Sequence, residues 1–426
     1  MKIFLTLLII GQILMAAKTE TIEIKGVKIP LIYEEDNRLP LVSTQIVFTN
    51  SGSITDIQKA GLAKVSAKIL NEGTKTEGSN AFAEALESKA ISISAHSGTE
   101  TFVLEVSSLK DEYANSMNCL ETLLKDPNYS AKALEKIKTM TVGGLSRKEN
   151  DFDYIAGNEL KSLLFTGSVL AQPSSGTKES VESINMTDVK KFTAEHIVLS
   201  RAIVVVGGDI DIKLVKKTLT EVLSTLEVGK SEPLVQIKVD KKIKNSVLKR
   251  ETEQAYVYFG SPYDISIDSS EFYKARVAMF ILGTGGFGSR LMEEVRVKRG
   301  LAYSAYARVN VTKSSSYMSG YLQTKLESME EAKATVKEVI ATFVKKGVTK
   351  DELEQTKKFI LGSEPLRVET MSQRLSRTFQ EYYKGFELGS SELELEQIQN
   401  LKLKDLNKYI KEHKEILDIS FAIVTK

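Results

Sequence analysis

The chain has 426 residues, a formal net charge of +2, and is 42% hydrophobic and 27% charged. This length exceeds the roughly 250–300 residues that one hydrophobic core usually supports, so at least two domains are expected. The composition excludes a disordered chain and a coiled coil. Because acidic and basic residues are interspersed, nothing points to nucleic acid or an anionic membrane as a partner.

Residues 1–17 have the pattern of a cleavable signal peptide. Lys2 supplies the positive charge, residues 3–15 are mostly apolar, and two alanines precede polar residues. The alternative is a membrane anchor, but the run is shorter than the roughly 20 residues of a spanning helix. We therefore predict a secreted protein of the bacterial periplasm with no membrane span in the mature chain. Cys119 is the only cysteine, so no internal disulfide can form.

Residues 18–230 are predicted to form a first domain of strands and helices. Alternating apolar and polar residues predict strands, and apolar residues at helical spacing predict helices. The strands are expected at 21–33, 42–49, 92–107 (as two strands) and 202–209, and the helices at 62–73, 81–89, 113–125, 131–163 (bent or broken near Asn150) and 211–226.

A second domain is predicted at 248–426, after a linker at 231–247 that contains Pro233 and several lysines. The order strand, helices, strands, helices, closing strand occurs twice, which predicts two structurally similar α+β halves of about 200 residues. The strands are expected at 254–259, from 301 onward and at 419–424, and the helices at 272–282, 289–298, 327–345, 351–362 and within 366–413.

The histidines argue against a zinc site on this chain. A catalytic zinc ion needs three protein ligands from His, Asp, Glu or Cys. His96, His196 and His413 are far apart, and none has a second histidine at the spacing of a helical metal pair. A site built from carboxylates and one histidine is the remaining alternative.

Six segments of the chain carry a family resemblance. They are Gly61-Leu62-Ala63, Gly73-Thr74, Leu86–Ala95, Asp126-Pro127, Gly207–Asp209 and Gly283–Ser304. Together they resemble the pitrilysin-like zinc peptidases, the M16 family, over nearly the whole mature chain. This family includes the mitochondrial processing peptidase, the core proteins of the cytochrome bc1 complex and bacterial two-subunit relatives. The resemblance implies two α/β-sandwich halves with the LuxS/MPP-like metallohydrolase fold.

The resemblance also implies that the metal site is lost. In active members, H-x-x-E-H supplies two zinc ligands and the catalytic base, and a later Glu is the third ligand. The corresponding positions here are Lys64, Ala67, Lys68 and Gly144. Two ammonium groups would repel a zinc ion. The spacing of Lys64 and Lys68 predicts a solvated helix face; the alternative is that they clamp a substrate carboxylate.

Residues 289–304 resemble the Arg/Tyr element of the family. Carried over by position, Arg296 and Tyr303 match the pair that contacts substrate, and both side chains can donate hydrogen bonds to a peptide carbonyl or an oxyanion. The alternative is a surface arginine and a half-buried strand tyrosine. The glycines at 283, 285, 286 and 288 lack the phosphate-loop spacing, so a flexible turn is predicted.

His96 falls close to where the family binds extended peptide by strand addition, but an ordinary polar loop residue is the favoured interpretation. The sequence therefore predicts a non-catalytic, substrate-binding subunit of a heteromeric periplasmic zinc peptidase. No cofactor is expected on this chain, and zinc is expected on a homologous M16 partner subunit that acts on a peptide substrate. The alternatives are an inactive peptide-binding or structural scaffold of the same fold, or a hydrolase that uses other residues.

Overall fold

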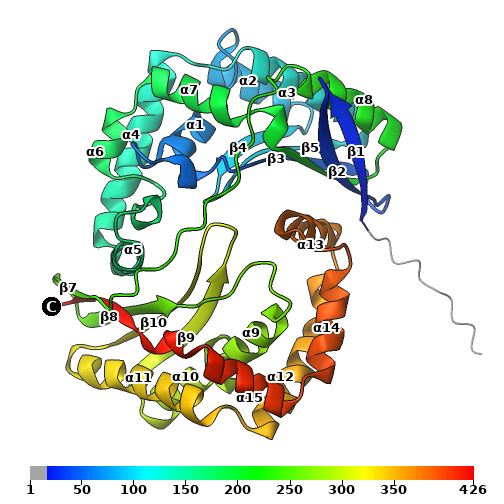
Figure 1. The fold of residues 1–426 in the computed structure, drawn as a ribbon. Coiled ribbons are helices and arrows are strands. Elements are labelled where there is room, and N and C mark those ends of the chain that lie inside the picture. The colour runs from blue at the N-terminus through cyan, green and yellow to red at the C-terminus, as the bar shows by residue number, and fades with distance from the viewer. Residues whose placement is uncertain (1–16) are drawn as a thin grey trace, which may run out of the picture.

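The computed structural model describes residues 17–426 and consists of two α/β halves whose sheets face each other (Figure 1). The predicted signal peptide therefore lies almost entirely outside the described residues. Helices cover the outer face of each sheet, and a hydrophobic core fills the space between sheet and helices in each half. Within residues 17–426, no helix is long and apolar enough to cross a membrane.

The first half contains a six-stranded sheet with the order β1-β2-β6-β3-β5-β4. Among the described strands of this sheet, only β2 and β6 pair in parallel, and β4 is the edge strand opposite β1. The strands are β1 (Lys18–Ile24), β2 (Val27–Glu35), β3 (Leu41–Thr49), β4 (Ser92–Ser97), β5 (Thr101–Leu109) and β6 (Ala202–Gly208).

Helices of the first half follow the predicted pattern, with two omissions. The break expected near Asn150 separates α4 from α5. Two short helices, α6 and α7, were not predicted, although Thr177 and Asn185 begin each with a capping box. The helices are α1 (Leu62–Leu70), α2 (Gly78–Glu87), α3 (Tyr113–Lys125), α4 (Ala131–Arg147), α5 (Phe152–Leu164), α6 (Lys178–Ser183), α7 (Met186–His196) and α8 (Ile212–Leu223).

The second half repeats the strand order of the first. Its order β7-β11-β8-β10-β9 matches β2-β6-β3-β5-β4, including one parallel pair at the same place. This match confirms the two similar halves and makes β9 the counterpart of the edge strand β4. The strands are β7 (Asn245–Lys249), β8 (Gln254–Pro262), β9 (Ala302–Val311), β10 (Ser316–Lys325) and β11 (Ser420–Thr425).

The second half contains seven α-helices and two π-helical segments among the described residues. The helix predicted at 289–298 is α-helical only at its start and then widens into a π-helix. The π-helical segments are Phe280–Thr284 and Glu293–Lys298, and the α-helices are α9 (Phe272–Met279), α10 (Arg290–Met292), α11 (Met329–Lys346), α12 (Lys350–Ser363), α13 (Met371–Lys384), α14 (Ser390–Asn400) and α15 (Leu403–Glu412).

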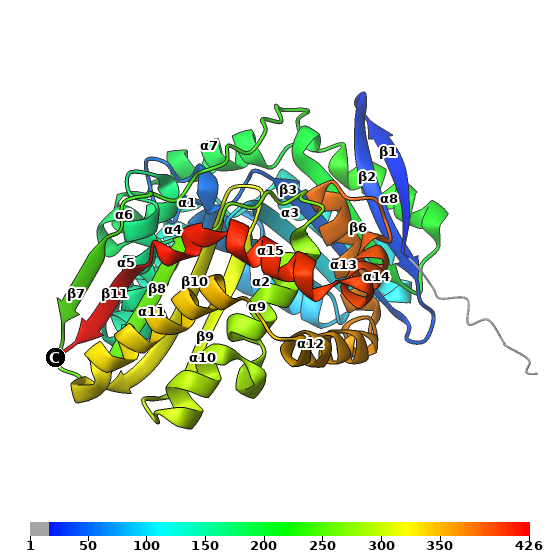
Figure 2. The ribbon, with the colours of Figure 1, turned by 60° about the horizontal axis from the view of Figure 1, so that its bottom comes forward.

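Two helices cross from one half to the other and join them. Helix α5 of the first half packs on the second sheet, where Leu160 and Leu164 contact Ala422. Helix α13 of the second half lies against β2 and β6 (Figure 2), where Leu375 completes a cluster with residues of the first sheet. The inner faces of both sheets are therefore partly covered by helices of the opposite half.

Candidate functional site

Helix α1 carries three of the four positions of the degenerate metal site. Its start is fixed by Asp56, whose carboxylate accepts hydrogen bonds from the backbone N–H groups of Gly61 and Ala63 at 3.0 and 2.9 Å. These bonds satisfy two donors that the first turn of a helix leaves free. Asp56 is only 3% exposed, and this burial raises the pKa of its carboxyl to about 7.

The two lysines of α1 are held by hydroxyl groups. Lys64 Nζ donates to Ser174 Oγ and Ser175 Oγ, both at 3.0 Å, and Lys68 Nζ donates to Thr141 Oγ1 at 2.8 Å. Lys68 is exposed, whereas Lys64 is partly buried. The prediction of a solvated face is therefore wrong for Lys64, because the loop that contains Ser174 covers this end of α1.

The other two positions supply neither the catalytic base nor the third metal ligand. Ala67 is 2% exposed and packs in the core of the first half, and Gly144 lies on α4 without a side chain. Zinc requires anionic or neutral donors, but this site offers two ammonium groups and no donor at the other two positions. Within residues 17–426, no group of three His, Cys, Asp or Glu side chains is arranged to hold a metal ion. The residues present therefore do not fit zinc.

Arg296 and Tyr303 lie together in the second half. The guanidinium carbon of Arg296 is 4.2 Å from the centre of the Tyr303 ring and 4.7 Å from the centre of the Phe287 ring. Tyr303 is 80% exposed and Phe287 is 66% exposed, so Tyr303 is not the half-buried strand residue of the alternative interpretation. Two aromatic faces hold the cation at the surface through cation–π attraction.

Neighbouring arginines on the same segment are bound differently. Arg290 donates to Glu352 Oε1 at 2.6 Å and Arg299 donates to Glu338 Oε2 at 2.8 Å. Among the described residues, Arg296 forms no ion pair within 4 Å. Its hydrogen-bond donors are therefore available to a ligand, whereas Arg290 and Arg299 have structural partners.

The glycine-rich turn places Phe287, which sequence reasoning missed. Gly283 lies so close to the backbone of Ala307 on β9 that a Cβ atom would overlap it, whereas Gly286 adopts a φ of +60° that favours glycine. The turn thereby packs its start on the sheet and projects Phe287 toward Arg296. The only sequence signal was an apolar residue between glycines, which does not by itself indicate an aromatic contact.

The remaining sequence candidates are scattered. Lys64 and Lys68 belong to the first half, and Arg296 and Tyr303 belong to the second, so each pair forms a site of its own. His96 is exposed on the edge strand β4. His196 ends α7, and His413 follows α15, where its Nδ1 lies 2.7 Å from Glu415 Oε1.

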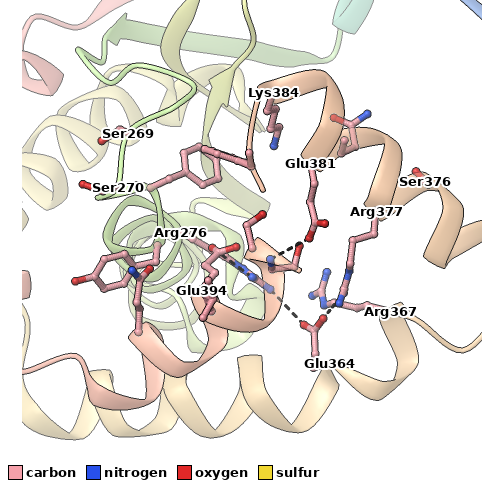
Figure 3. Close-up of a pocket in the computed structure, with 18 of the residues that line it drawn as sticks. Ser269, Ser270, Arg276, Glu364, Arg367, Ser376, Arg377, Glu381, Lys384 and Glu394 are labelled. Carbon is pink, nitrogen blue, oxygen red and sulfur yellow. Dashed lines mark hydrogen bonds and ion pairs between the residues drawn. The ribbon is translucent and has the colours of Figure 1, made fainter. Parts of the chain in front are cut away.

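A pocket of about 690 Å³ lies among α9, α13 and α14 (Figure 3). Its central charges pair with each other. Glu364 forms ion pairs with both Arg276 and Arg377, and Arg276 also lies 3.4 Å from Glu394. We interpret this network as the support of α13, because it joins that helix to its neighbours.

Two family models match most of the chain. Residues 32–178 match the model described as insulinase (peptidase family M16), and residues 183–360 match the model described as the peptidase M16 inactive domain.

Individual proteins agree with these matches. The non-peptidase homolog YmxG of Helicobacter pylori is 44% identical over 427 residues, which is 100% of this chain and 99% of that protein. The crystal structure of a peptidase M16 inactive domain from Pseudomonas fluorescens has a TM-score of 0.88 at 22% identity, covering 96% and 97% of the two chains. A protease from Helicobacter pylori has a TM-score of 0.82 at 15% identity, covering 96% of this chain and 100% of its own.

Proposed function

Because the chain belongs to peptidase family M16 and is a non-peptidase homologue within it, we propose that it is the substrate-binding subunit of a heteromeric zinc peptidase. In this proposal, Arg296 and Tyr303 contact the peptide near the bond that is cleaved. A homologous partner chain of the M16 family binds the zinc ion and supplies the catalytic base. This chain binds no zinc, because Lys64, Ala67, Lys68 and Gly144 offer no ligand set.

The observation that carries the proposal is the state of Arg296. Its guanidinium rests between two exposed rings and has no carboxylate partner among the described residues. Arg290 and Arg299, on the same segment, are instead paired with glutamates. A guanidinium and a phenol held side by side can donate hydrogen bonds to a peptide carbonyl or to negative charge that develops on its oxygen.

The comparisons support a pair of related chains. The Helicobacter pylori proteins similar to this chain include a non-peptidase homologue and a protease with the same fold. A non-catalytic chain and a catalytic chain of one fold can coexist in one bacterium, which is what the proposed complex requires. The signal-like residues 1–17 support a periplasmic location for it.

The proposal is tested by purifying the chain alone, its zinc-bearing homologue alone, and the two together. We expect cleavage of a peptide only by the mixture, and co-elution of the two chains. Arg296→Ala should lower the kcat/KM of the mixture by about 100-fold, the typical effect of removing one donor to an oxyanion.

Arg299→Ala is the matched control, because it removes a neighbouring arginine that faces Glu338 instead of the two rings. This variant should retain nearly full activity. Cleavage by the lone chain, or an unchanged rate after Arg296→Ala, would overturn the proposal. Peptide binding by the chain with no partner and no effect of Arg296→Ala would identify a scaffold instead.

A further inference from the structure

Five basic side chains gather where the two halves meet, and we call them the basic surface. Its members come from α1, the turn after α4, α5 and the edge strand β9. They are Lys64, Lys68, Lys148, Lys161 and Arg308. Lys64 and Lys68 are tied to hydroxyl groups, and Lys148 Nζ lies 4.4 Å from the centre of the Tyr154 ring.

The charges on this surface act on one another. Burial lowers the pKa of Lys64, and the positive charges of Lys148, Lys161 and Lys68 lower it further. Burial followed by the charge of Arg308 lowers the pKa of Lys161. Helix α5, which carries Lys161, packs on the second sheet, where Tyr258 donates a hydrogen bond to Asp153 of α5. Because Arg308 belongs to that sheet, the basic surface spans both halves.

Carboxylates do not neutralise the basic surface. None of its five members forms an ion pair within 4 Å among the described residues. The negative group that acts on Lys64 is Asp56, but Asp56 is buried and already accepts two backbone hydrogen bonds. Asp153, on α5, accepts a hydrogen bond from Tyr258 at 3.1 Å. The surface therefore retains unmatched positive charge.

Tyrosines line the same face of the second sheet. Residues directly opposite each other in a sheet share a face, and the register pairs Arg308 with Ser319, Tyr306 with Tyr321, and Tyr321 with Tyr258. The rings of Tyr306 and Tyr321 meet edge to face at 4.5 Å. Tyrosine offers an apolar face for side-chain packing and a hydroxyl that donates to carboxylates.

We propose that the basic surface binds acidic side chains of the peptide substrate, so that the subunit selects peptides with a negatively charged segment. This inference rests on the proposed function and specifies its substrate class. Charge complementarity supports it, because unmatched cations beside hydroxyl donors favour aspartate and glutamate over lysine and arginine. The lysines at the former metal positions thereby contribute to recognition instead of catalysis.

The position of Arg308 also sets a distance. Tyr303 and Arg308 lie on the same strand, but a register shift between them lets β10 span the same stretch with one residue fewer. An extended peptide along this edge, at about 3.3 Å per residue, would therefore place its acidic segment about four to five residues from the group that contacts Tyr303. This spacing predicts where in a substrate the acidic residues are needed.

The test measures binding of fluorescent peptides of equal length to the chain without a partner. One peptide carries a run of glutamates, one carries lysines at the same positions, and one carries serines. We expect the acidic peptide to bind at least about tenfold more tightly than the basic one, with an affinity that falls as salt rises. Lys64→Gln/Lys68→Gln should weaken binding of the acidic peptide by about tenfold and leave the serine peptide unaffected.

Lys213→Gln/Lys217→Gln is the matched control, because it removes two lysines at the same spacing from α8. Circular dichroism checks that both double variants are folded. Equal binding of the acidic and basic peptides, no binding of any peptide, or equal effects of the two double variants would overturn the inference. These outcomes do not depend on Arg296, whereas a loss of its effect on proteolysis would overturn the proposed function alone.

Discussion

At the scale of single residues, the partner of a charged side chain decides what that side chain can do. Arg290 and Arg299 form ion pairs with glutamates on α12 and α11, and these pairs join their segment to the helices of the second half. Arg296 lies on the same segment but rests on aromatic rings, which attract the cation without using its hydrogen-bond donors. The same contrast separates Lys64, tied to serines, from the many surface lysines that pair with carboxylates.

His196 gives a prediction at this scale. Burial, followed by the charge of Arg201, lowers the pKa of its imidazole from 6.5 to about 4. Between these two pH values the unfolded chain binds the proton and the folded chain does not, so the free energy of unfolding falls as the pH drops. In His196→Gln, this part of the acid destabilisation should disappear.

Urea unfolding at about pH 7 and about pH 5 measures the effect. The raised pKa of Asp56 favours the folded state as the pH falls in both the original chain and His196→Gln, so the difference between them is the informative quantity. Relative to about pH 7, His196→Gln should be more stable at about pH 5 than the original chain is. His96→Gln is the control, because His96 is exposed on β4, and this variant should behave as the original chain does. Equal changes in all three proteins would contradict the prediction.

At the scale of elements, close backbone packing positions the segment that carries Arg296. The π-helical segment Phe280–Thr284 packs against β9 at Gly283, and the second π-helical segment contains Arg296 itself. A π-helical turn inserts one extra residue, which rotates the side chains that follow. The direction of Arg296 therefore depends on how its segment is seated on the sheet.

Gly283→Ala tests this dependence. The added methyl group would overlap the backbone of Ala307, so we expect a loss of about 1–3 kcal/mol in the free energy of unfolding. Gly288→Ala is the control, because its methyl group would meet no atom within 4 Å, and it should change stability by less than about 0.5 kcal/mol. Thermal unfolding followed by circular dichroism compares them, and an equal effect of both variants would contradict this account.

Sequence periodicity predicted the buried elements and missed those fixed by contacts far along the chain. The strands β3, β6, β8 and β11 have strong apolar patterns because they lie inside the sheets. In contrast, β7 is an edge strand whose alternating side chains are exposed or only partly buried. It begins at the end of the predicted linker, after residues 227–244, which form no helix or strand.

The candidate site was only partly predictable for the same reason. Resemblance identified Arg296 and Tyr303 because they belong to a local motif. Phe287 was missed because its role depends on a turn that folds back. The partial burial of Lys64 was missed because the covering serines lie more than a hundred residues away in sequence.

At the scale of the whole molecule, the two halves are joined by α5 and α13. Arg374 of α13 donates to Glu34 Oε1 of β2 at 2.9 Å and also lies 3.5 Å from Asp36 Oδ2. Tyr383, at the other end of α13, donates to Glu100 Oε2 at 2.7 Å. These contacts join α13 of the second half to the first half. They therefore help to position the basic surface, whose members come from both halves, relative to the tyrosines of the second sheet.

Arg374→Met should weaken this junction. Glu34 is only 1% exposed, and loss of its cation leaves a buried carboxylate without compensation, which costs about 3–5 kcal/mol. Lys18→Met is the control, since Lys18 and its partner Glu35 are both exposed and the loss of this ion pair should cost less than about 1 kcal/mol. Urea unfolding measures both variants, and a similar small effect of each would show that the Arg374 ion pair does not stabilise the junction.

The burial of Ala67 makes the loss of the metal site hard to reverse. A glutamate introduced at this position alone would place a carboxylate against the core, between two lysines. No metal ion would offset the free-energy cost of burying that charge. Replacing Lys64 and Lys68 with histidines would still leave Gly144 without a third ligand. No single substitution at these four positions supplies a complete set of zinc ligands. In the proposed complex, the zinc chemistry therefore stays with the partner chain.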